Sequence, residues 1–170
     1  MKIVQYMGLM ANGCYAVVDE SNQSGSINLE EVLPKEVMAN FAQTVGKFGD
    51  LIIGRRTFDL FPSRMPGIEM VVLSRSPLKY EGVNVAASPS EALSLLEKKG
   101  FETALVGGGA QIVSTFLSQG LVDELYINIY PLIGKGSTFA TSENFQASLE
   151  LIGVDKLSSD IVQLHYRVRR

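Results

Sequence analysis

Cysteine and histidine are nearly absent from this chain of 170 residues, which contains one of each, Cys14 and His165. A single cysteine excludes a disulfide bond within the chain and a zinc site with several cysteine ligands. A single histidine likewise excludes a site built from several histidines. We therefore expect no metal centre. Cys14 is interpreted as a small buried hydrophobic residue, and His165 as a packing or surface residue.

The sequence also lacks long hydrophobic runs and an excess of positive charge. Its most apolar stretches are interrupted within about ten residues, too short to span a bilayer, and residues 1–6 do not resemble a signal peptide. We therefore expect a cytoplasmic protein without membrane association. The net charge of −3 argues against nucleic-acid binding. With 46% hydrophobic and 19% charged residues, the chain is expected to form one domain over residues 1–170.

Strand-like and helix-like segments alternate along the chain, which is typical of an α/β fold. Short apolar runs predict strands at residues 2–10, 50–54, 70–74, 83–86, 103–106, 121–130, 147–157 and 161–169. Helices are expected to begin at Pro34, near Arg55, after Ser88 and after Gly109. Only residues 158–160 join the last two strands, so these are expected to form an antiparallel hairpin after a parallel sheet.

Two of the predicted helices carry more specific signals. Ser88, Pro89 and Glu91 have the spacing of a capping box, in which the serine and glutamate side chains bond to the first backbone N–H groups. The buried face of the first helix is expected to consist of apolar residues at helical spacing: Val37, Met38, Phe41, Val45 and Phe48.

Three predicted strands end in polar or glycine-rich turns, at residues 54–57, 73–76 and 106–110. Because ligands of open α/β sheets bind outside the carboxyl ends of the strands, we expect these turns to meet at one edge. Glycines let a phosphate approach the backbone, helix N-termini attract anions, and arginines bind phosphates through paired hydrogen bonds. Together the turns predict a dinucleotide cradle, and the two arginine-bearing turns favour NADP over NAD.

Each turn alone has a simpler interpretation. Three glycines after a strand are often only a tight turn, and Arg55 and Arg56 are compatible with a solvated helix start. The segment after Val106 lacks the third spaced glycine of a Rossmann fingerprint and the lysine of a P-loop. The prediction of phosphate binding therefore depends on the three turns being brought together.

Three sequence blocks, taken in order, resemble the dihydrofolate reductase-like superfamily. They are residues 51–58 (LIIGRRTF), residues 65–76 (MPGIEMVVLSRS) and residues 104–131, which begin ALVGGGA and continue through LVDELYI. The chain is most similar to stand-alone reductases related to the C-terminal domain of the bifunctional riboflavin-biosynthesis deaminase-reductase. This resemblance implies a central, mostly parallel eight-stranded sheet with flanking helices, a C-terminal antiparallel hairpin and a homodimer.

The resemblance also implies NADPH as the hydride donor. Residues 54–57 and 107–111 would hold its phosphates, residues 74–76 the adenosine-side phosphate, and residues 8–9 would lie beside the nicotinamide. The bond between Gly107 and Gly108 is expected to be cis. The cofactor-binding set is Gly8, Leu9, Gly54, Arg55, Arg56, Thr57, Leu73, Ser74, Arg75, Ser76, Val106, Gly107, Gly108, Gly109, Ala110 and Gln111.

The chain departs from the folate-reducing members at several positions. It contains no tryptophan, and residues 20–33 do not resemble their tryptophan-containing substrate loop. In relatives more generally the first strand often ends in an Asp-Gly turn, where this chain has Asn12 and Gly13. Glu36 stands where the folate-reducing enzymes carry an acid that contacts the pterin. It is a candidate proton donor, with a favourable charge in the first helical turn as the simpler interpretation. Asn128 is a candidate to hydrogen-bond a heterocycle, with a structural role as its alternative.

We therefore predict an NADPH-dependent reductase that transfers hydride to a carbon of a small heterocyclic substrate of pyrimidine or pterin type. The blocks favour the 5-amino-6-(5-phosphoribosylamino)uracil reductase reaction of riboflavin biosynthesis, whose acceptor is the ribosyl C1. Dihydrofolate reductase activity is one alternative. A dinucleotide-binding dimeric module without reductase activity is the other, motivated by Asn12 and residues 20–33.

Overall fold

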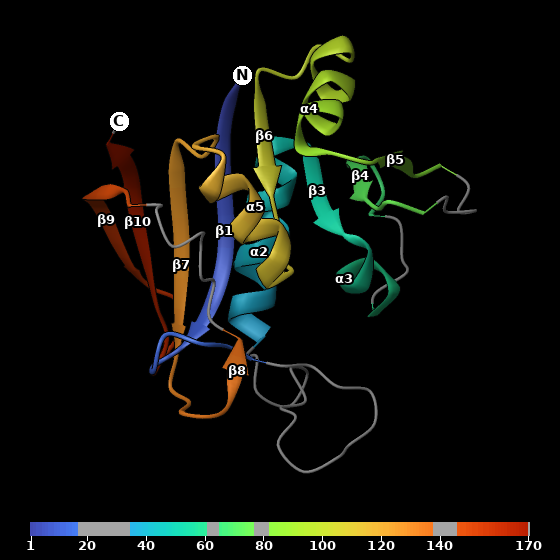
Figure 1. The fold of residues 1–170 in the computed structure, drawn as a ribbon. Helices are drawn as coiled ribbons and strands as arrows, with labels where there is room; N and C mark the ends of the chain where they lie inside the picture. The colour runs from blue at the N-terminus through green and yellow to red at the C-terminus, as the bar shows by residue number, and fades with distance from the viewer. Residues whose placement is uncertain (17–34, 61–64, 77–81, 138–145, 170) are drawn as a thin grey trace.

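An eight-stranded sheet runs through the middle of the molecule, in the order β5–β4–β3–β6–β1–β7–β10–β9 (Figure 1). The computed structural model describes residues 1–16, 35–60, 65–76, 82–137 and 146–169. The strands of the sheet are β1 (Lys2–Met10), β3 (Asp50–Gly54), β4 (Glu69–Leu73), β5 (Asn84–Ala86), β6 (Thr103–Val106), β7 (Glu124–Tyr130), β9 (Ser148–Lys156) and β10 (Val162–Arg169). A separate small sheet pairs β2 (Tyr15–Ala16) with β8 (Gly136–Ser137).

The pairing of the strands confirms the predicted topology. The strands from β5 to β7 run parallel, whereas β10 is antiparallel to both β7 and β9. The last pair is the expected hairpin. The strand predicted at residues 121–130 begins only at Glu124, because Leu121 N still donates to Phe116 at the end of the preceding helix.

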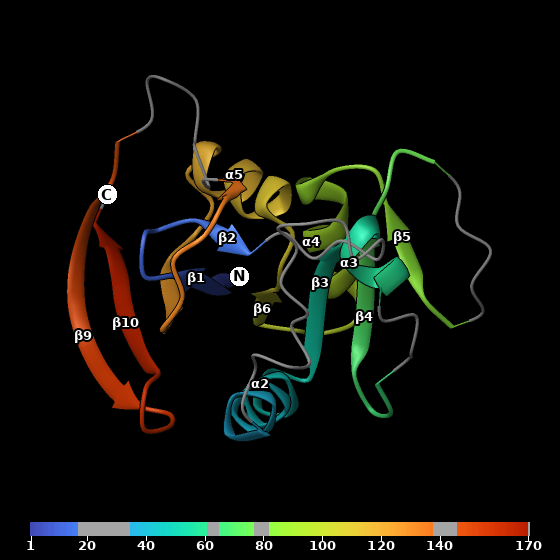
Figure 2. The ribbon, with the colours of Figure 1, turned by 90° about the horizontal axis from the view of Figure 1, so that it is seen from below.

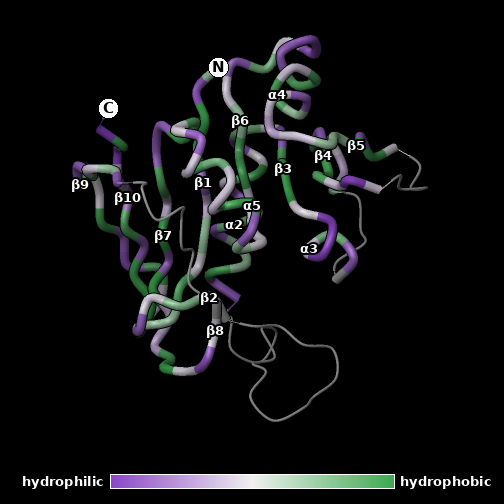
Figure 3. The backbone as a smooth tube through the Cα atoms, viewed as in Figure 1, coloured by the Kyte–Doolittle hydropathy of each residue, from purple (hydrophilic) through white to green (hydrophobic). Residues whose placement is uncertain are grey.

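Helices cover both faces of the sheet (Figure 2). Helix α2 (Lys35–Phe48) lies on one face, and α4 (Pro89–Lys98) and α5 (Ala110–Ser118) lie on the other, while α3 (Arg55–Leu60) continues directly from β3. Alternate residues of the strands belong to two apolar clusters. One cluster lies between the sheet and helices α4 and α5, and the other lies between the sheet and α2. Strands β3 and β6 are accordingly hydrophobic along most of their length, and the start of α3, which follows β3, is hydrophilic (Figure 3).

Two local predictions need correction. Met38 of α2 is 50% exposed, whereas Val37 and Val45 are buried. A residue next to a buried one is turned about 100° away from it on a helix, so Met38 leaves the inner face. Cys14 is half-buried and not a core residue.

The capping box of α4 is confirmed with one difference. Ser88 Oγ accepts a hydrogen bond from Glu91 N at 3.2 Å. The Glu91 carboxylate accepts from Ala87 N at 2.7 Å, one residue before the position expected for a capping box. Within the described residues, no helix is long and apolar enough to cross a membrane.

Candidate functional site

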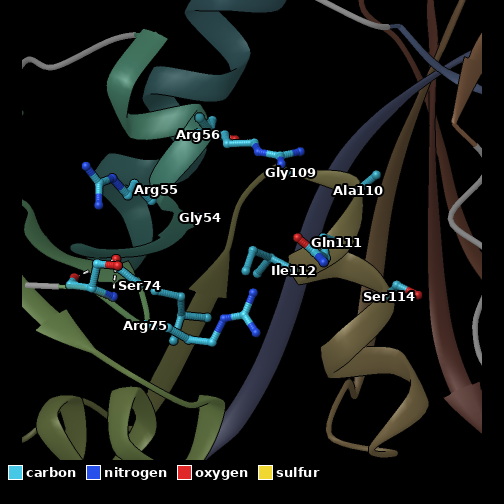
Figure 4. Close-up of a pocket in the computed structure, with 13 residues that line it drawn as sticks. Gly54, Arg55, Arg56, Ser74, Arg75, Gly109, Ala110, Gln111, Ile112 and Ser114 are labelled. Carbon is cyan, nitrogen blue, oxygen red and sulfur yellow. Dashed lines mark hydrogen bonds between the residues drawn. The ribbon is translucent and has the colours of Figure 1, made fainter.

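The three predicted turns meet around one cavity of about 740 Å³ at the carboxyl edge of β3, β4 and β6 (Figure 4). This happens because the three strands are parallel and β3 lies between the other two. Helix α3 follows β3 and helix α5 begins after β6, so both helices begin at the cavity. The lining residues are Gly54, Arg55, Arg56, Thr57, Leu73, Ser74, Arg75, Ser76, Gly109, Ala110, Gln111, Ile112 and Ser114.

The N-terminus of α5 supplies backbone donors to this cavity. Its first hydrogen bonds run from Ile112 N and Val113 N to Gly109 O, so the N–H groups of Ala110 and Gln111 are not used within the helix. Gly109 has a φ of +100°, a value that side chains disfavour, and this conformation turns the chain into the helix. Free N–H groups and the helix dipole are the features by which helix N-termini bind anions in proteins.

Two arginines point toward this helix end. In Figure 4, Arg56 extends toward Gly109 and Arg75 extends toward Ile112, whereas Arg55 points away. Arg55 pairs instead with Asp59 one turn later, at 3.3 Å. Arg56 and Arg75 are exposed and form no ion pair within the described residues. The cavity therefore presents two uncompensated positive charges beside the α5 N-terminus.

Ser74 holds the turn that carries Arg75. Its hydroxyl donates to Ser76 O at 2.7 Å and accepts from Ser76 N at 3.2 Å, while Ser74 N donates to Ala86 O of β5. The Ser74 hydroxyl therefore donates and accepts its hydrogen bonds within its own turn. We infer that Ser74 positions Arg75 as part of the cavity wall.

Glycine is present at the positions near the cavity for different physical reasons. A Cβ atom on Gly54 would lie 2.7 Å from Ile112 Cγ1, and one on Gly107 would lie 3.0 Å from the side chains of Leu51 and Ile53. These two glycines let elements pack closely. Among the predicted cofactor glycines, Gly108 alone would carry a Cβ atom with no neighbour of the described residues within 4 Å, so it leaves the most room for a ligand.

The expected cis bond between Gly107 and Gly108 is not found. All peptide bonds of the described residues are trans, the form that is strongly favoured outside proline. The chain changes direction through the positive φ of Gly109 instead.

Five predicted residues lie outside this cavity on the described strands and turn. Val106 and Leu9 are buried in the core under α4 and α5, and none of Gly8, Gly107 and Gly108 is among the lining residues. A Cβ atom on Gly8 would collide with the Tyr130 ring, so packing alone explains this glycine. The cofactor roles of these residues stay predictions.

The two candidate catalytic residues differ in their surroundings. Glu36 is exposed in the first turn of α2 and lines none of the described cavities. Asn128 is fully buried in β7; its Nδ2 donates to Tyr6 Oη at 2.8 Å, and its Oδ1 accepts from Gln163 Nε2 at 2.9 Å. The segment 20–33 lies outside the described residues.

Sequence reasoning missed the partners of Asn128. Tyr6 Oη donates to Asn40 Oδ1 at 2.8 Å, and Gln163 Nε2 also reaches that oxygen at 3.2 Å, which closes a ring of four side chains from β1, α2, β7 and β10. Burial raises the pKa of Tyr6 above its ordinary value, so its phenol stays neutral. The sequence feature that could have revealed this ring is Gln163, a polar residue at an inward-facing position of a strand whose side chains alternate between the two faces.

A second group of charged residues lies at the opposite ends of the parallel strands, where β1 and β7 begin. Glu124 accepts from Lys2 at 2.8 Å and bonds to His165 at 3.0 Å, and the His165 ring stacks on Tyr126 with centroids 4.0 Å apart. The pKa of Glu124 is lowered, because these two partners outweigh the effect of its burial. His165 is therefore a packing residue, one of the two roles expected from the sequence, and the structure adds its contact with Glu124.

Comparison with known proteins defines the family. Residues 34–163 match the model of the RibD C-terminal domain. The chain therefore belongs to the RibD C-terminal domain family, a reductase-like family of riboflavin biosynthesis.

Solved structures share the whole fold. A protein from Shewanella sp. PV-4 named for riboflavin biosynthesis matches with a TM-score of 0.79 and 21% identity, covering 100% of both chains. A pyrimidine reductase-like protein from Corynebacterium diphtheriae matches with a TM-score of 0.78 and 16% identity, covering 99% of this chain and 92% of that one. Dihydrofolate reductase type 3 of Salmonella typhimurium is 38% identical over 96 residues, which is 56% of each chain. The expected reductase-like architecture is thereby confirmed.

Proposed function

We propose that the protein is an NADPH-dependent reductase of a pyrimidine-type heterocycle, with the cofactor phosphates held in the cavity between β3, β4 and α5. The observation that carries this proposal is the pair of arginines Arg56 and Arg75, which extend toward the N-terminus of α5 and form no ion pair with any residue that the structure describes. When bound, NADPH supplies the hydride that reduces an electrophilic carbon.

The residues of the cavity fit a dinucleotide with an additional phosphate. Arg56 and the N–H groups of Ala110 and Gln111 would bind the pyrophosphate, because all of them face the turn at Gly109. Arg75 would bind the phosphate that distinguishes NADPH from NADH, since it stands on the neighbouring strand end. Gly108 would leave space for the approach of the cofactor.

The pyrimidine-type substrate is supported by the family and by the name of the relative from Corynebacterium diphtheriae. We favour 5-amino-6-(5-phosphoribosylamino)uracil as the substrate. Dihydrofolate is the second candidate, favoured by the match to dihydrofolate reductase type 3 over 96 residues.

Titration with NADPH and NADH tests the cofactor site. We expect the wild type to prefer NADPH, and Arg75→Ala to reduce this preference by about tenfold or more, because a charge-assisted bond to phosphate contributes about 1.5–3 kcal/mol. Arg56→Ala should weaken both cofactors alike. Cofactor fluorescence measures the binding, and Arg169→Ala on β10 is the matched control.

Equal affinities for NADPH and NADH in the wild type would contradict the proposal, and so would arginine variants that bind like the wild type. NADPH oxidation in the presence of each candidate substrate then separates the two reductase activities. Cofactor binding without oxidation of either would favour the dinucleotide-binding module.

We also propose that two copies associate through the outer part of the sheet. Leu149, Leu151 and Val154 of β9 are 40%, 53% and 58% exposed. They pair with Val168, Tyr166 and Leu164 of β10, so the six residues form one apolar face. A face of this kind is typical of an interface between protein chains.

A further inference from the structure

A tight turn follows β1 at residues 11–13. Gly13 N donates to Met10 O and Met10 N donates to Cys14 O, each at 2.8 Å, which is the bonding of a three-residue hairpin loop. Gly13 has a φ of +78°, the left-handed conformation that such a loop requires at its last position. All three residues of the turn are exposed, so water reaches the bond between Asn12 and Gly13.

The side chain of Asn12 links this turn to the β7–β8 connection, residues 131–135. Asn12 Nδ2 donates to Gly134 O at 2.8 Å, and Ala11 N donates to Leu132 O at 2.8 Å. Beyond these contacts, β2 and β8 pair through two residues on each strand. An isolated pair of strands this short has little stability of its own, so the bond from Asn12 contributes to holding the pair together.

Asn12 is the one asparagine of the sequence that precedes a glycine. The backbone nitrogen of the following residue can attack an asparagine side-chain carbon and close a five-membered ring, and glycine hinders this attack least because it has no Cβ atom. A Cβ atom on Gly13 would have no described neighbour within 4 Å, so its surroundings are open as well. Asn84 and Asn128 each precede a β-branched residue, which hinders such an attack.

We propose that Asn12 is a site of spontaneous deamidation, and that the reaction cuts the side-chain link between the turn at residues 11–13 and the β7–β8 connection. This inference is separate from the proposed reductase function, because it concerns the covalent structure of the chain and needs neither cofactor nor substrate.

The reaction balances with water as its one co-reactant. Gly13 N gives up its proton to hydroxide and attacks Asn12 Cγ, so an N–Cγ bond forms and the Cγ–Nδ2 bond breaks. Nδ2 takes up a proton from water and leaves as ammonia, and a succinimide ring remains. Water then opens the ring at Cγ to give aspartate, or at the main-chain carbonyl carbon to give isoaspartate. No atom is oxidised or reduced.

The folded turn sets the rate of this reaction. Two hydrogen bonds hold the groups that must react, because Met10 O holds the proton of Gly13 N and Gly134 O holds Asn12 Nδ2. The attack therefore proceeds from molecules in which the turn has opened. Exposed turns at the ends of strands open at low free-energy cost, so a fraction of the molecules is always reactive.

The product cannot restore the link. A carboxylate at position 12 has no hydrogen to donate to Gly134 O, and its negative charge meets the negative end of that carbonyl dipole. Isoaspartate also lengthens the main chain by a methylene group, which displaces Gly13 from Met10. We therefore expect the bond from Ala11 N to Leu132 O to open more often after deamidation.

Incubation of the purified protein at mildly alkaline pH, followed by peptide mass spectrometry, tests the reaction. We expect the mass change from NH₂ to OH at Asn12 and at neither Asn84 nor Asn128. The native protein should react about tenfold more slowly than the urea-unfolded chain, because two hydrogen bonds must open first, and the rate should rise with pH. Asn12→Gln is the matched control, since it keeps an amide but has to close a six-membered ring and should react far more slowly.

Hydrogen exchange of Asn12→Asp tests the loss of the link. We expect the Ala11 amide to exchange about fivefold faster than in the wild type, because the neighbouring hydrogen bond is gone. Amides of the β1–β6 pair should exchange as in the wild type. Asn12→Ala, which removes the donor without adding a charge, should show a smaller increase at Ala11.

The proposal is overturned if Asn12 of the native protein keeps its amide, or reacts no faster than Asn84, while the urea-unfolded chain deamidates at Asn12. An Asn12 amide that survives in the unfolded chain as well would overturn it too, because the asparagine–glycine pair would then be unreactive. Equal exchange of the Ala11 amide in Asn12→Asp and in the wild type would contradict the proposed loss of the link.

Discussion

Asp50 is a buried acid at the start of β3, far in the chain from the Leu105 backbone it contacts. Its Oδ1 accepts from Leu105 N at 2.7 Å, and its Oδ2 has no hydrogen-bond partner among the described residues. Burial raises the pKa of Asp50 from 3.8 to about 7, and the bond from Leu105 offsets only part of this effect. The carboxyl is therefore protonated in the native state under mildly acidic conditions.

This raised pKa makes stability depend on pH. Between about pH 4 and pH 7 the unfolded state gives up the Asp50 proton while the native state keeps it, so the free energy of unfolding falls as pH rises and levels off above about 7. Asp50→Asn keeps an acceptor for Leu105 N and removes the titration. We expect it to flatten the profile of melting temperature against pH and to be the more stable protein near pH 8. A variant with the wild-type pH profile would contradict this account, and the exposed Asp155→Asn is the control.

Gln5 also has buried polar atoms without a hydrogen-bond partner among the described residues. It is fully buried in β1, and neither its Nε2 nor its Oε1 has a hydrogen-bond partner within the described residues. Gln5→Met fills the same volume without a desolvated amide, so we expect the free energy of unfolding to rise by about 1–2 kcal/mol in urea denaturation. Gln163→Met should lower it, because Gln163 is hydrogen-bonded. The same sign for both substitutions would contradict the prediction.

At the scale of elements, the contact between Gly54 and Ile112 places α5 against the end of β3. A Cβ atom on Gly54 would lie 2.7 Å from Ile112 Cγ1. We expect Gly54→Ala to push the first turn of α5 outward, to lower stability by about 1–3 kcal/mol and to weaken NADPH binding. Thermal unfolding and cofactor titration measure the two effects.

A double-variant cycle checks the cause. Gly54→Ala/Ile112→Ala removes the colliding atoms, so the loss should be smaller than the sum of the two single losses. Additive losses would show that the Ile112 side chain does not mediate the effect of Gly54.

At the scale of the whole molecule, the apolar face of β9 and β10 determines the expected assembly. β9 is the last strand of the sheet, and β10 is the one strand with which it pairs within the described residues. We expect the wild type to sediment as a dimer and Leu151→Lys to sediment as a monomer, because a charge at the centre of an apolar interface is strongly disfavoured. Ile133→Lys, at a position 85% exposed outside this face, should leave the dimer intact. A wild-type monomer at all concentrations would contradict the assembly.

Local patterns in the sequence determined the elements of this protein. Apolar runs bounded by glycine and polar residues marked the strands at residues 2–10, 50–54 and 103–106, which the structure places at the same residues. Ser88 and Glu91 marked the start of α4. Turns at strand ends marked the cavity, because parallel strands bring their carboxyl ends to one edge whatever their order. These predictions succeed because backbone geometry and side-chain period act over a few residues.

Only the tertiary structure decided what individual residues touch. The sequence suggested room for a ligand at Gly8 and Gly54, and the structure shows Tyr130 and Ile112 against them. Asn128 was interpreted alone, yet its partners come from residues 6 and 163, on other strands. Contacts between residues far apart in the chain depend on the order and register of the strands, and no local pattern encodes these. The residue types at the carboxyl ends of the strands could therefore be predicted from the sequence, whereas the neighbours of each side chain are determined only in the folded molecule.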